Sequence, residues 1–197
     1  MRPWERVAKR ALDLTGATLG LVLASPVLAA AAVAIKLEDG GPVLFRQGRP
    51  GLGGRIFDVY KLRTMHVGEH RGGVDVGDAR ITRVGALLRA TSIDELPQLA
   101  NVLRGQMSLV GPRPTLAEQV ASYTPEQARR MDVMPGLTGW AQVQGRSSIP
   151  WSRRIELDVW YVDHQSLALD LRIIARTVGV LARRGQVYRH PGGGFDL

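Results

Sequence analysis

The stretch Leu14–Ile35 carries no charged residue, and it limits more than any other feature how this chain can fold. A helix that spans a bilayer needs about 20 apolar residues, so the stretch is long enough to cross a membrane. Ser25-Pro26 lies near its middle, and proline removes a backbone hydrogen bond and kinks a helix. The stretch therefore predicts a kinked membrane helix.

Basic residues flank this stretch on both sides, with Arg2, Arg6, Lys9 and Arg10 before it and Lys36, Arg46 and Arg49 after it. A spanning helix normally shows positive charge on one side. Charge on both sides suits a hairpin that enters and leaves through one membrane face, but a kinked spanning helix is equally compatible with these residues. The run Ala29–Ala34 imitates a signal-peptide cleavage region, although the following sequence has no secreted character.

The composition excludes several classes of protein. A hydrophobic content of 45% in 197 residues is ordinary, so the chain is not a polytopic membrane protein. The absence of cysteine excludes a disulfide scaffold, a Cys-ligated metal site and thiol catalysis. The net charge of +8 predicts an anionic partner, which could be a nucleic acid, an anionic membrane or a phosphorylated substrate.

Short strands and helices are predicted after Gly40-Gly-Pro42, which ends the first segment. The expected strands are Val43–Phe45 and Ile56–Tyr60, joined by the glycine-rich loop Gly48–Gly54. The expected helices are Ile81–Arg89, one that begins at Thr124-Pro125, and Leu167–Ala182. In the last helix, an apolar stripe comprises Leu167, Leu171, Ile174, Val178 and Leu181, and the arginines lie off it. Both an interfacial helix on an anionic membrane and an ordinary surface helix packed on a core fit this pattern.

Asp94 and Glu95 form an acidic pair that could be catalytic. Ser92 and Glu95 imitate a capping box, which gives Glu95 a purely structural alternative role. Pro97 is tolerated in the first turn of a helix, so the helix is expected to begin at Asp94. The helix dipole would then hold Asp94 ionised.

Several cations could neutralise a diphosphate beside this pair: Lys61, Arg63, Arg89 and Arg113. Pro112 and Pro114 stiffen the backbone around Arg113, and Glu95 could bind Mg²⁺. Asp158 and Asp163 could orient a site or pair with Arg153 and Arg154. Taken alone, the acidic pair is weak evidence, because most such pairs are solvated surface charges.

Eight motifs in this chain occur in a recognisable order: Lys9–Asp13, Ser25-Pro26, Gly41–Gln47, Tyr60–Met65, Asp78–Thr82, Ser92–Leu99, Met107–Pro114 and Pro135–Arg146. Together they resemble the bacterial sugar transferases, the monotopic phosphoglycosyl transferases that start glycan assembly on a polyprenyl phosphate carrier. The resemblance covers nearly the whole chain and suggests the catalytic unit alone, without the additional N-terminal membrane helices of larger members.

The resemblance implies a ping-pong reaction. Asp94 would attack the β-phosphate of a UDP-sugar, release UMP and form a covalent sugar-phosphoryl aspartate, which polyprenyl phosphate then attacks. Glu95 is the residue associated with Mg²⁺. Arg113, between Pro112 and Pro114, would contact the nucleotide or its phosphates, and Lys61, Arg63 and Arg89 are further substrate-binding candidates.

The resemblance also implies a location and an architecture. Ser25-Pro26 would make the apolar helix re-enter the bacterial cytoplasmic membrane instead of crossing it, with the active site on the cytoplasmic face. The expected fold is α+β and mainly helical, with a re-entrant hairpin helix (1–38), a small cytoplasmic domain with short strands and amphipathic interfacial helices (39–187), and a flexible tail (188–197). No nucleic-acid partner is expected, although a non-enzymatic basic membrane-surface or nucleic-acid-binding protein is the alternative function.

Overall fold

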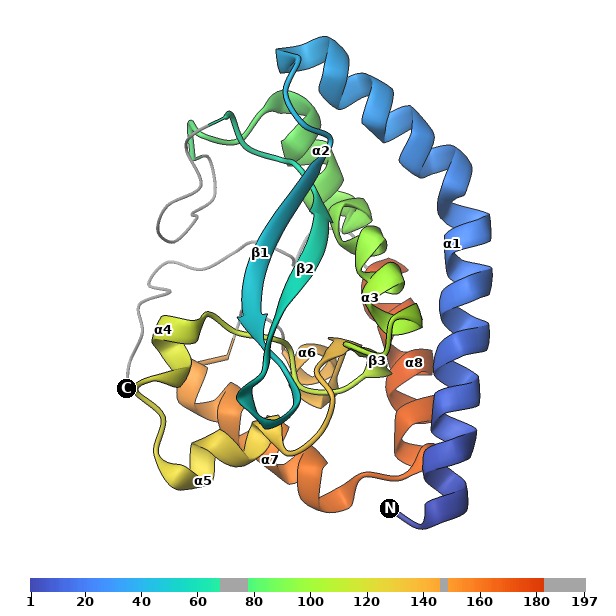
Figure 1. Ribbon diagram of the computed structural model, residues 1–197, viewed down its shortest axis with the longest axis vertical. Helices are drawn as coiled ribbons and strands as arrows, with labels where there is room; N and C mark the ends of the chain where they lie inside the picture. The colour runs from blue at the N-terminus through green and yellow to red at the C-terminus, as the bar shows by residue number, and fades with distance from the viewer. Residues whose placement is uncertain (68–77, 146–148, 183–197) are drawn as a thin grey trace.

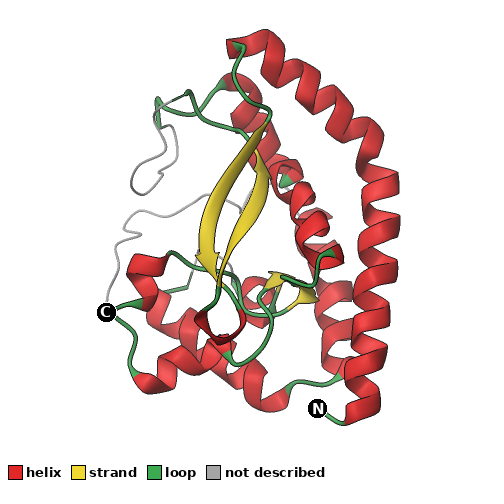
Figure 2. Ribbon diagram, in the orientation of Figure 1, coloured by secondary structure: helices red, strands yellow, loops and turns green. Residues whose placement is uncertain are grey.

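The computed structural model describes residues 1–67, 78–145 and 149–182. Its elements are α1 (Pro3–Asp39), β1 (Leu44–Pro50), the 3-10 helix η1 (Leu52–Gly54), β2 (Ile56–Leu62), α2 (Arg83–Thr91), the 3-10 helix η2 (Ile93–Gln98), α3 (Leu99–Leu103), β3 (Ser108–Val110), α4 (Ala117–Val120), α5 (Pro125–Ala128), the 3-10 helix η3 (Arg129–Met131), β4 (Gly136–Thr138), α6 (Trp140–Gln144), α7 (Trp151–His164) and α8 (Leu167–Ala182). The fold is α+β and mainly helical, as predicted (Figure 2). The predicted tail 188–197 lies outside the described residues.

Helix α1 runs along one side of the molecule and bends part-way (Figure 1). Pro26 lies inside the helix and has no N–H to donate to the carbonyl of Val22. The Ser25 hydroxyl donates to that carbonyl instead, at 2.8 Å. The two arms do not fold back antiparallel on each other (Figure 1), so the Ser-Pro pair produces a bend without leaving the Val22 oxygen unpaired.

The N-terminal arm of α1 buries charged residues and exposes apolar ones. Lys9 donates to Asp170 Oδ2 of α8 at 2.7 Å and to the Val110 carbonyl at 3.0 Å. Asp13 accepts hydrogen bonds from the Ser108 hydroxyl and from the Leu109 N–H, each at 2.9 Å. The exposed side of α1 is instead apolar, and comprises Trp4, Val7, Leu14, Leu19, Val22, Leu23, Val27, Val33 and Leu37. This is the reverse of the pattern expected for a helix whose exposed face meets water.

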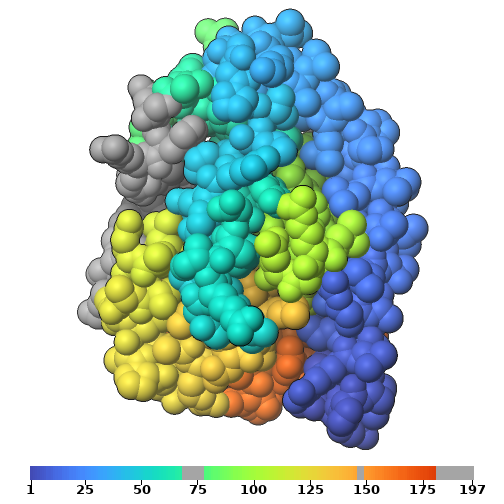
Figure 3. All heavy atoms as spheres, in the orientation of Figure 1, coloured from blue at the N-terminus to red at the C-terminus, as the bar shows by residue number. Residues whose placement is uncertain are grey.

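By length and composition, α1 could cross a membrane. Its most apolar 18-residue window has a mean hydropathy of 2.2 and is only 11% buried in the protein. In the space-filling view, α1 forms one edge of the molecule (Figure 3). The helix ends at Gly40, whose φ of 70° is the left-handed cap expected from Gly40-Gly-Pro42.

The antiparallel pair of β1 and β2 runs from the end of α1 toward α4 and packs against η2, α3 and α4 (Figure 1). Both strands are longer than predicted, because the pairing extends to Pro50 and Leu62. Three of the residues assigned to the connecting loop, Gly48, Arg49 and Pro50, belong to β1, and the turn begins at Gly51. The pairing places Lys61 opposite Phe45, with β2 packed against η2.

Strands β3 and β4 are parallel and pair Ser108 with Gly136 and Val110 with Thr138. The two chain segments approach so closely that a Cβ at Gly136 would collide with the backbone nitrogen of Gly111. Position 136 of β4 therefore requires glycine, because it lies against Gly111, where the chain leaves β3 toward Pro112-Arg-Pro114. The Gly136 N–H also donates to the Pro112 carbonyl at 2.9 Å, which fixes the start of that segment.

Helix α8 has the predicted bounds, Leu167–Ala182. Over residues 167–180, its buried residues are Leu169, Asp170 and Ile173, none of which belongs to the predicted apolar stripe. Two residues of that stripe, Leu171 and Val178, are 50% and 65% exposed. Helix α8 packs on the core through Leu169 and Ile173 while these two stripe residues face outward, which is compatible with both alternatives for this helix.

Three clusters of buried apolar residues support the fold. One joins Ala17 of α1 to α3 and Met107, and a second joins Ala31 and Ile35 of α1 to Leu62 and Leu88. The third joins β3 to α7 and α8 around Tyr161 and Ile173. Because α1 contributes to two of them, it is packed along the rest of the fold, while the predicted domain boundary at residues 38 and 39 stays a prediction.

Candidate functional site

Asp94 and Glu95 lie in η2, directly after α2. The joint between the two helices is Ser92, which adopts the left-handed conformation with φ of 58°. The 3-10 helix begins at Ile93, so the expectation that the helix begins at Asp94 was wrong. In a 3-10 helix the hydrogen bonds join the backbone groups of residues three apart, so each turn is shorter than an α-helical turn. Pro97 is therefore accommodated without a full α-helical turn before it.

Glu95 is held by two cations. Lys61 Nζ of β2 donates to Oε1 at 3.0 Å, and Arg113 binds both carboxylate oxygens, with Nη1 at 3.0 Å from Oε2 and Nη2 on Oε1. These cations hold the pKa of Glu95 well below its usual range, against the effect of burial. The Ser92 side chain makes no capping hydrogen bond, so the capping-box explanation of Glu95 is wrong.

Asp94 is buried, with 6% of its surface exposed. Burial, followed by the neighbouring negative charge of Glu95, raises its pKa from 3.8 to about 6. Lys61, Arg113 and Arg89 oppose this rise. Within the described ranges, no hydrogen bond or ion pair of the Asp94 carboxylate is present. The expectation that the helix dipole holds Asp94 ionised left out this desolvation, which works against the charged form.

The predicted cations divide into two groups. Lys61 and Arg113 bind Glu95, and Arg89 lies close enough to lower the pKa of Asp94 while its Nε donates to Thr64 at 2.7 Å. Arg63 is different: it is buried and pairs with Asp39 at the end of α1. Arg63 therefore joins β2 to α1, and makes no contact with the acidic pair in the part of the chain that the structure describes.

Sequence reasoning did not place Arg49 at this site. Its guanidinium is close to both Glu95 and Arg113, and it donates to Gln47 Oε1 at 2.7 Å. Burial, with the positive charge of Arg113, lowers its pKa to about 10. The strand alternation of β1 was the available signal, but the predicted strand ended at Phe45, before Arg49.

The backbone around Arg113 is fixed by a buried ion pair. Arg130 Nη2 donates to the Arg113 carbonyl at 2.9 Å and to Asp158. Both partners are almost fully buried, with 4% of each side chain exposed. Asp158 therefore pairs with Arg130, and Asp163 pairs with Arg129. The suggested partner Arg153 pairs with Glu156 instead, whereas the positive charge of Arg154 does act on Asp158.

The chain matches the bacterial sugar transferase family over residues 4–184, which is nearly its whole length. The chain belongs to this family. It is therefore a transferase, and the alternative of a non-enzymatic binding protein is set aside.

Related bacterial sugar transferases include a protein of Caulobacter vibrioides named UDP-glucose:undecaprenyl-phosphate glucose-1-phosphate transferase. The two are 50% identical over 203 residues, which cover 94% of this chain and 75% of the relative. An uncharacterized sugar transferase, EpsL of Bacillus subtilis, is 49% identical and is covered to 86%. A UDP-N-acetylgalactosamine-undecaprenyl-phosphate N-acetylgalactosaminephosphotransferase of Aeromonas hydrophila is 43% identical, but this chain covers only 42% of it.

Seen as a sugar transferase, the chain brings its separate motifs to one place. The motif in β2 supplies Lys61, that in η2 supplies the acidic pair, and that after β3 supplies Arg113. The earlier motif Lys9–Asp13 lies elsewhere and fastens α1 to β3 and α8. The site is thus a buried carboxyl group next to a carboxylate that is surrounded by cations.

Proposed function

We propose that this sugar transferase moves a sugar-1-phosphate from a UDP-sugar to a polyprenyl phosphate such as undecaprenyl phosphate. The observation that carries the proposal is Asp94, a buried carboxyl group whose neighbour Glu95 draws Lys61 and Arg113 to the same point. Cations at such a place stabilise the charge of a diphosphate, and an adjacent carboxylate can act as a nucleophile. The names of the relatives support the same donor and acceptor classes.

In the first step, an ionised Asp94 oxygen attacks the β-phosphorus of the UDP-sugar. The bond from that phosphorus to the oxygen shared with the α-phosphate breaks, and UMP leaves with this oxygen and its electron pair. The sugar phosphate stays on Asp94 as an acyl phosphate. Lys61 and Arg113 would neutralise the phosphate oxygens, and Arg49 and Arg89 would add positive charge around them.

In the second step, a phosphate oxygen of the polyprenyl phosphate attacks the same phosphorus. The bond to Asp94 breaks, the carboxylate is restored, and the product is a polyprenyl diphosphate sugar. Two successive steps let one site serve a soluble donor and a lipid acceptor in turn. Such a product is the starting point of exopolysaccharide, capsule, O-antigen or glycoprotein glycan synthesis.

Magnesium is proposed as the cofactor. Among the described residues, no group of three or more His, Cys, Asp or Glu side chains could hold a metal ion. Mg²⁺ commonly uses one or two carboxylates and completes its shell with water and substrate phosphates, which fits the Asp94 carboxylate. Both Glu95 oxygens bind Lys61 or Arg113, so Glu95 would have to exchange one of these cations for the ion. Glu95 would hold the ion, which when bound supplies positive charge against the diphosphate.

The activity is tested by measuring UMP release from a panel of UDP-sugars, with undecaprenyl phosphate and detergent-solubilised protein. UDP-glucose, UDP-galactose and UDP-N-acetylgalactosamine form the first panel. We expect UMP release with one of these donors and loss of release when EDTA removes Mg²⁺, with recovery on adding Mg²⁺. Release that persists at full rate in EDTA would contradict the metal assignment, and no release with any donor would contradict the proposed activity.

We further propose that α1 enters the bacterial cytoplasmic membrane and returns to the same face, leaving the active site on the cytoplasmic side. The exposed apolar side of α1 and the exposed residues Leu171 and Val178 of α8 support contact with lipid. The flanking charges support the topology less than expected, because Lys9 and Arg10 bond within the protein. The bend at Pro26 is the stronger support.

The topology predicts where single cysteine reporters react, in a chain that has no cysteine of its own. Arg6→Cys in the first turns of α1 and Ser122→Cys in the globular part should both react with an impermeant maleimide from the cytoplasmic side only. Pro26→Ala restores the N–H to Val22 and should straighten α1, so the Arg6→Cys reporter should move to the opposite side in a fraction of molecules. Val27→Ala, the next residue, is the matched control. Reaction of the two reporters from opposite sides in the otherwise unaltered chain would contradict the topology.

A further inference from the structure

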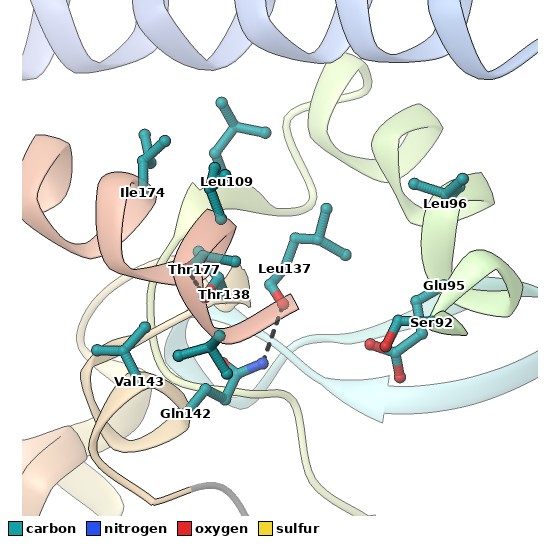
Figure 4. Close-up of a pocket in the computed structure, with 12 residues that line it drawn as sticks. Ser92, Glu95, Leu96, Leu109, Leu137, Thr138, Gln142, Val143, Ile174 and Thr177 are labelled. Atoms are coloured by element: carbon teal, nitrogen blue, oxygen red, sulfur yellow. Dashed lines mark hydrogen bonds between the residues drawn. The ribbon is translucent and has the colours of Figure 1, made fainter. Parts of the chain in front are cut away.

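An apolar cavity lies beside the acidic pair (Figure 4). Its volume is about 240 Å³, and its wall comes from η2, β3, β4, α6 and α8. In Figure 4, Leu109, Leu137 and Ile174 gather on one side of the cavity, and Ser92 and Glu95 lie on the other. The cavity thus runs from an aliphatic wall to the carboxylate that Lys61 and Arg113 bind.

Several polar side chains of the wall bond within it. The hydroxyls of Thr138 and Thr177 lie 2.7 Å apart and share a hydrogen bond. Gln142 Nε2 donates to the Leu137 carbonyl at 3.0 Å. A sugar or a nucleobase needs donors and acceptors directed at it, because its own polar groups lose water on binding. One acceptor of the wall, the buried Gln142 Oε1, has no hydrogen-bond partner among the described residues. The aliphatic remainder of the wall is suited to a hydrocarbon.

The cavity reaches an exposed apolar surface at α8. Val178 contributes to the wall and is 65% exposed, so it belongs both to the cavity and to the outside of the protein. Leu171, two turns earlier on the same helix, is 50% exposed. A ligand can therefore enter from the apolar outer side of α8, which is the side from which a lipid would come.

From this arrangement we infer that the cavity binds the isoprenoid units next to the phosphate of the polyprenyl phosphate acceptor. The inference rests on the proposed function and adds to it the place of the lipid chain. One ligand then satisfies both parts of the site. Its phosphate lies near the cations around Glu95, and its hydrocarbon fills the cavity and packs on Leu109, Leu137 and Ile174. Charge complementarity at one end and the apolar lining at the other select an anionic lipid over a soluble donor.

The first test fills the cavity from α6. Val143 lines the cavity, whereas its neighbour Gln144 is exposed, so Val143→Trp and Gln144→Trp make a matched pair. We expect Val143→Trp to raise the KM for undecaprenyl phosphate about tenfold, equivalent to about 1.4 kcal/mol of binding. The KM for the UDP-sugar and the UMP burst without acceptor should stay unchanged, and Gln144→Trp should change none of these values.

A second variant keeps the inference testable if Val143→Trp does not fold. Ile174→Asn replaces an aliphatic side chain of the wall with a smaller polar one, and should raise the KM for the acceptor in the same way. A rise in the KM for the UDP-sugar instead would assign the cavity to the donor and overturn the inference. An unchanged acceptor KM in both variants would overturn it as well, while absence of UMP burst in the unaltered protein would contradict the proposed function itself.

Photocrosslinking gives a readout that does not depend on turnover. An undecaprenyl phosphate analogue with a diazirine on its first isoprene unit should label the peptides of α6 and α8. Excess undecaprenyl phosphate should prevent labelling, and phosphatidylglycerol should not. Labelling of other peptides, or equal competition by phosphatidylglycerol, would show that the cavity is not specific for the polyprenyl chain and would overturn the inference.

Discussion

Asp94→Asn should abolish UMP release and at the same time make the protein more stable at pH 8. The loss of activity follows because asparagine cannot form the acyl phosphate, and the residual rate should be at least about a thousandfold lower, as for other lost nucleophiles. The gain in stability follows from burial, which makes the ionised carboxylate of Asp94 unfavourable in the folded state.

The pH dependence of this gain has a definite sign. The pKa of Asp94 is raised from 3.8 to about 6 on folding, so the protonated form is favoured in the folded protein. Asp94 lowers the free energy of unfolding least below about pH 4, where it is protonated in both the folded and the unfolded state. As the pH rises through about 6, its ionisation lowers the free energy of unfolding by about 3 kcal/mol. Asparagine avoids that cost, so the advantage of the variant should appear between these two values and persist at pH 8.

Thermal unfolding across pH 4 to 8 measures this effect, and about 3 kcal/mol corresponds to roughly 6–12 °C in Tm for a chain of this size. Asp132→Asn is the matched control, because Asp132 is exposed and should show no such change. UMP release by the unaltered protein should also rise with pH through about 6, as Asp94 ionises. Normal release by Asp94→Asn would contradict its role as nucleophile, and a lower Tm at pH 8 would contradict its burial as an uncompensated charge.

Asp158→Ala should destabilise the protein by about 3–5 kcal/mol, because it leaves a buried arginine without its countercharge. Arg130 has few ways to reach water: it is 5% exposed and its guanidinium lies 5.8 Å from the ring centre of Tyr123 and 5.7 Å from that of Trp151. Its bond to the Arg113 carbonyl should be disturbed too, which predicts a raised KM for the UDP-sugar.

Urea unfolding of two further variants separates this pair from ordinary surface charges. Asp163→Ala removes the partner of Arg129 in an exposed pair, whose side chains are 44% and 37% exposed, and should cost less than about 1 kcal/mol. Combining Asp158→Leu with Arg130→Met removes both buried charges and should recover much of the stability lost in Asp158→Ala. A cost as small for Asp158→Ala as for Asp163→Ala would show that the buried pair does not support the Arg113 segment.

Local patterns in the sequence predicted local structure well. The apolar repeat gave α8 its bounds, Thr124-Pro125 begins α5 with the Thr124 cap, and Gly40 ends α1. Each of these features depends on residues within one or two turns of chain. Strand ends were less accurate, because the pairing of β1 with β2 extends over residues that carry turn signals, such as Gly48 and Pro50.

Long-range pairing was beyond such patterns. Arg63 and Asp39 are 24 residues apart and Lys9 and Asp170 are 161 apart, and nothing near either residue indicates its partner. The pKa of Asp94 also depends on distant parts of the chain. The effect of the helix dipole can be inferred from one helix, whereas desolvation depends on every segment packed around the carboxyl group. The motifs located the acidic pair, but only the three-dimensional arrangement shows which cations reach it.

The buried charges of α1 have a mechanical consequence. Because Lys9 and Asp13 fasten α1 to α8 and β3, and Arg10 donates to the carbonyls of Val102 and Leu103, this arm cannot slide along its axis without breaking several polar bonds at once. Under the proposed membrane topology, the molecule should therefore tilt as a rigid body in a thicker or thinner bilayer, since moving α1 alone would be more costly than a modest hydrophobic mismatch. The height of Asp94 above the hydrocarbon would then be set by the protein's own dimensions and not by the lipid around it.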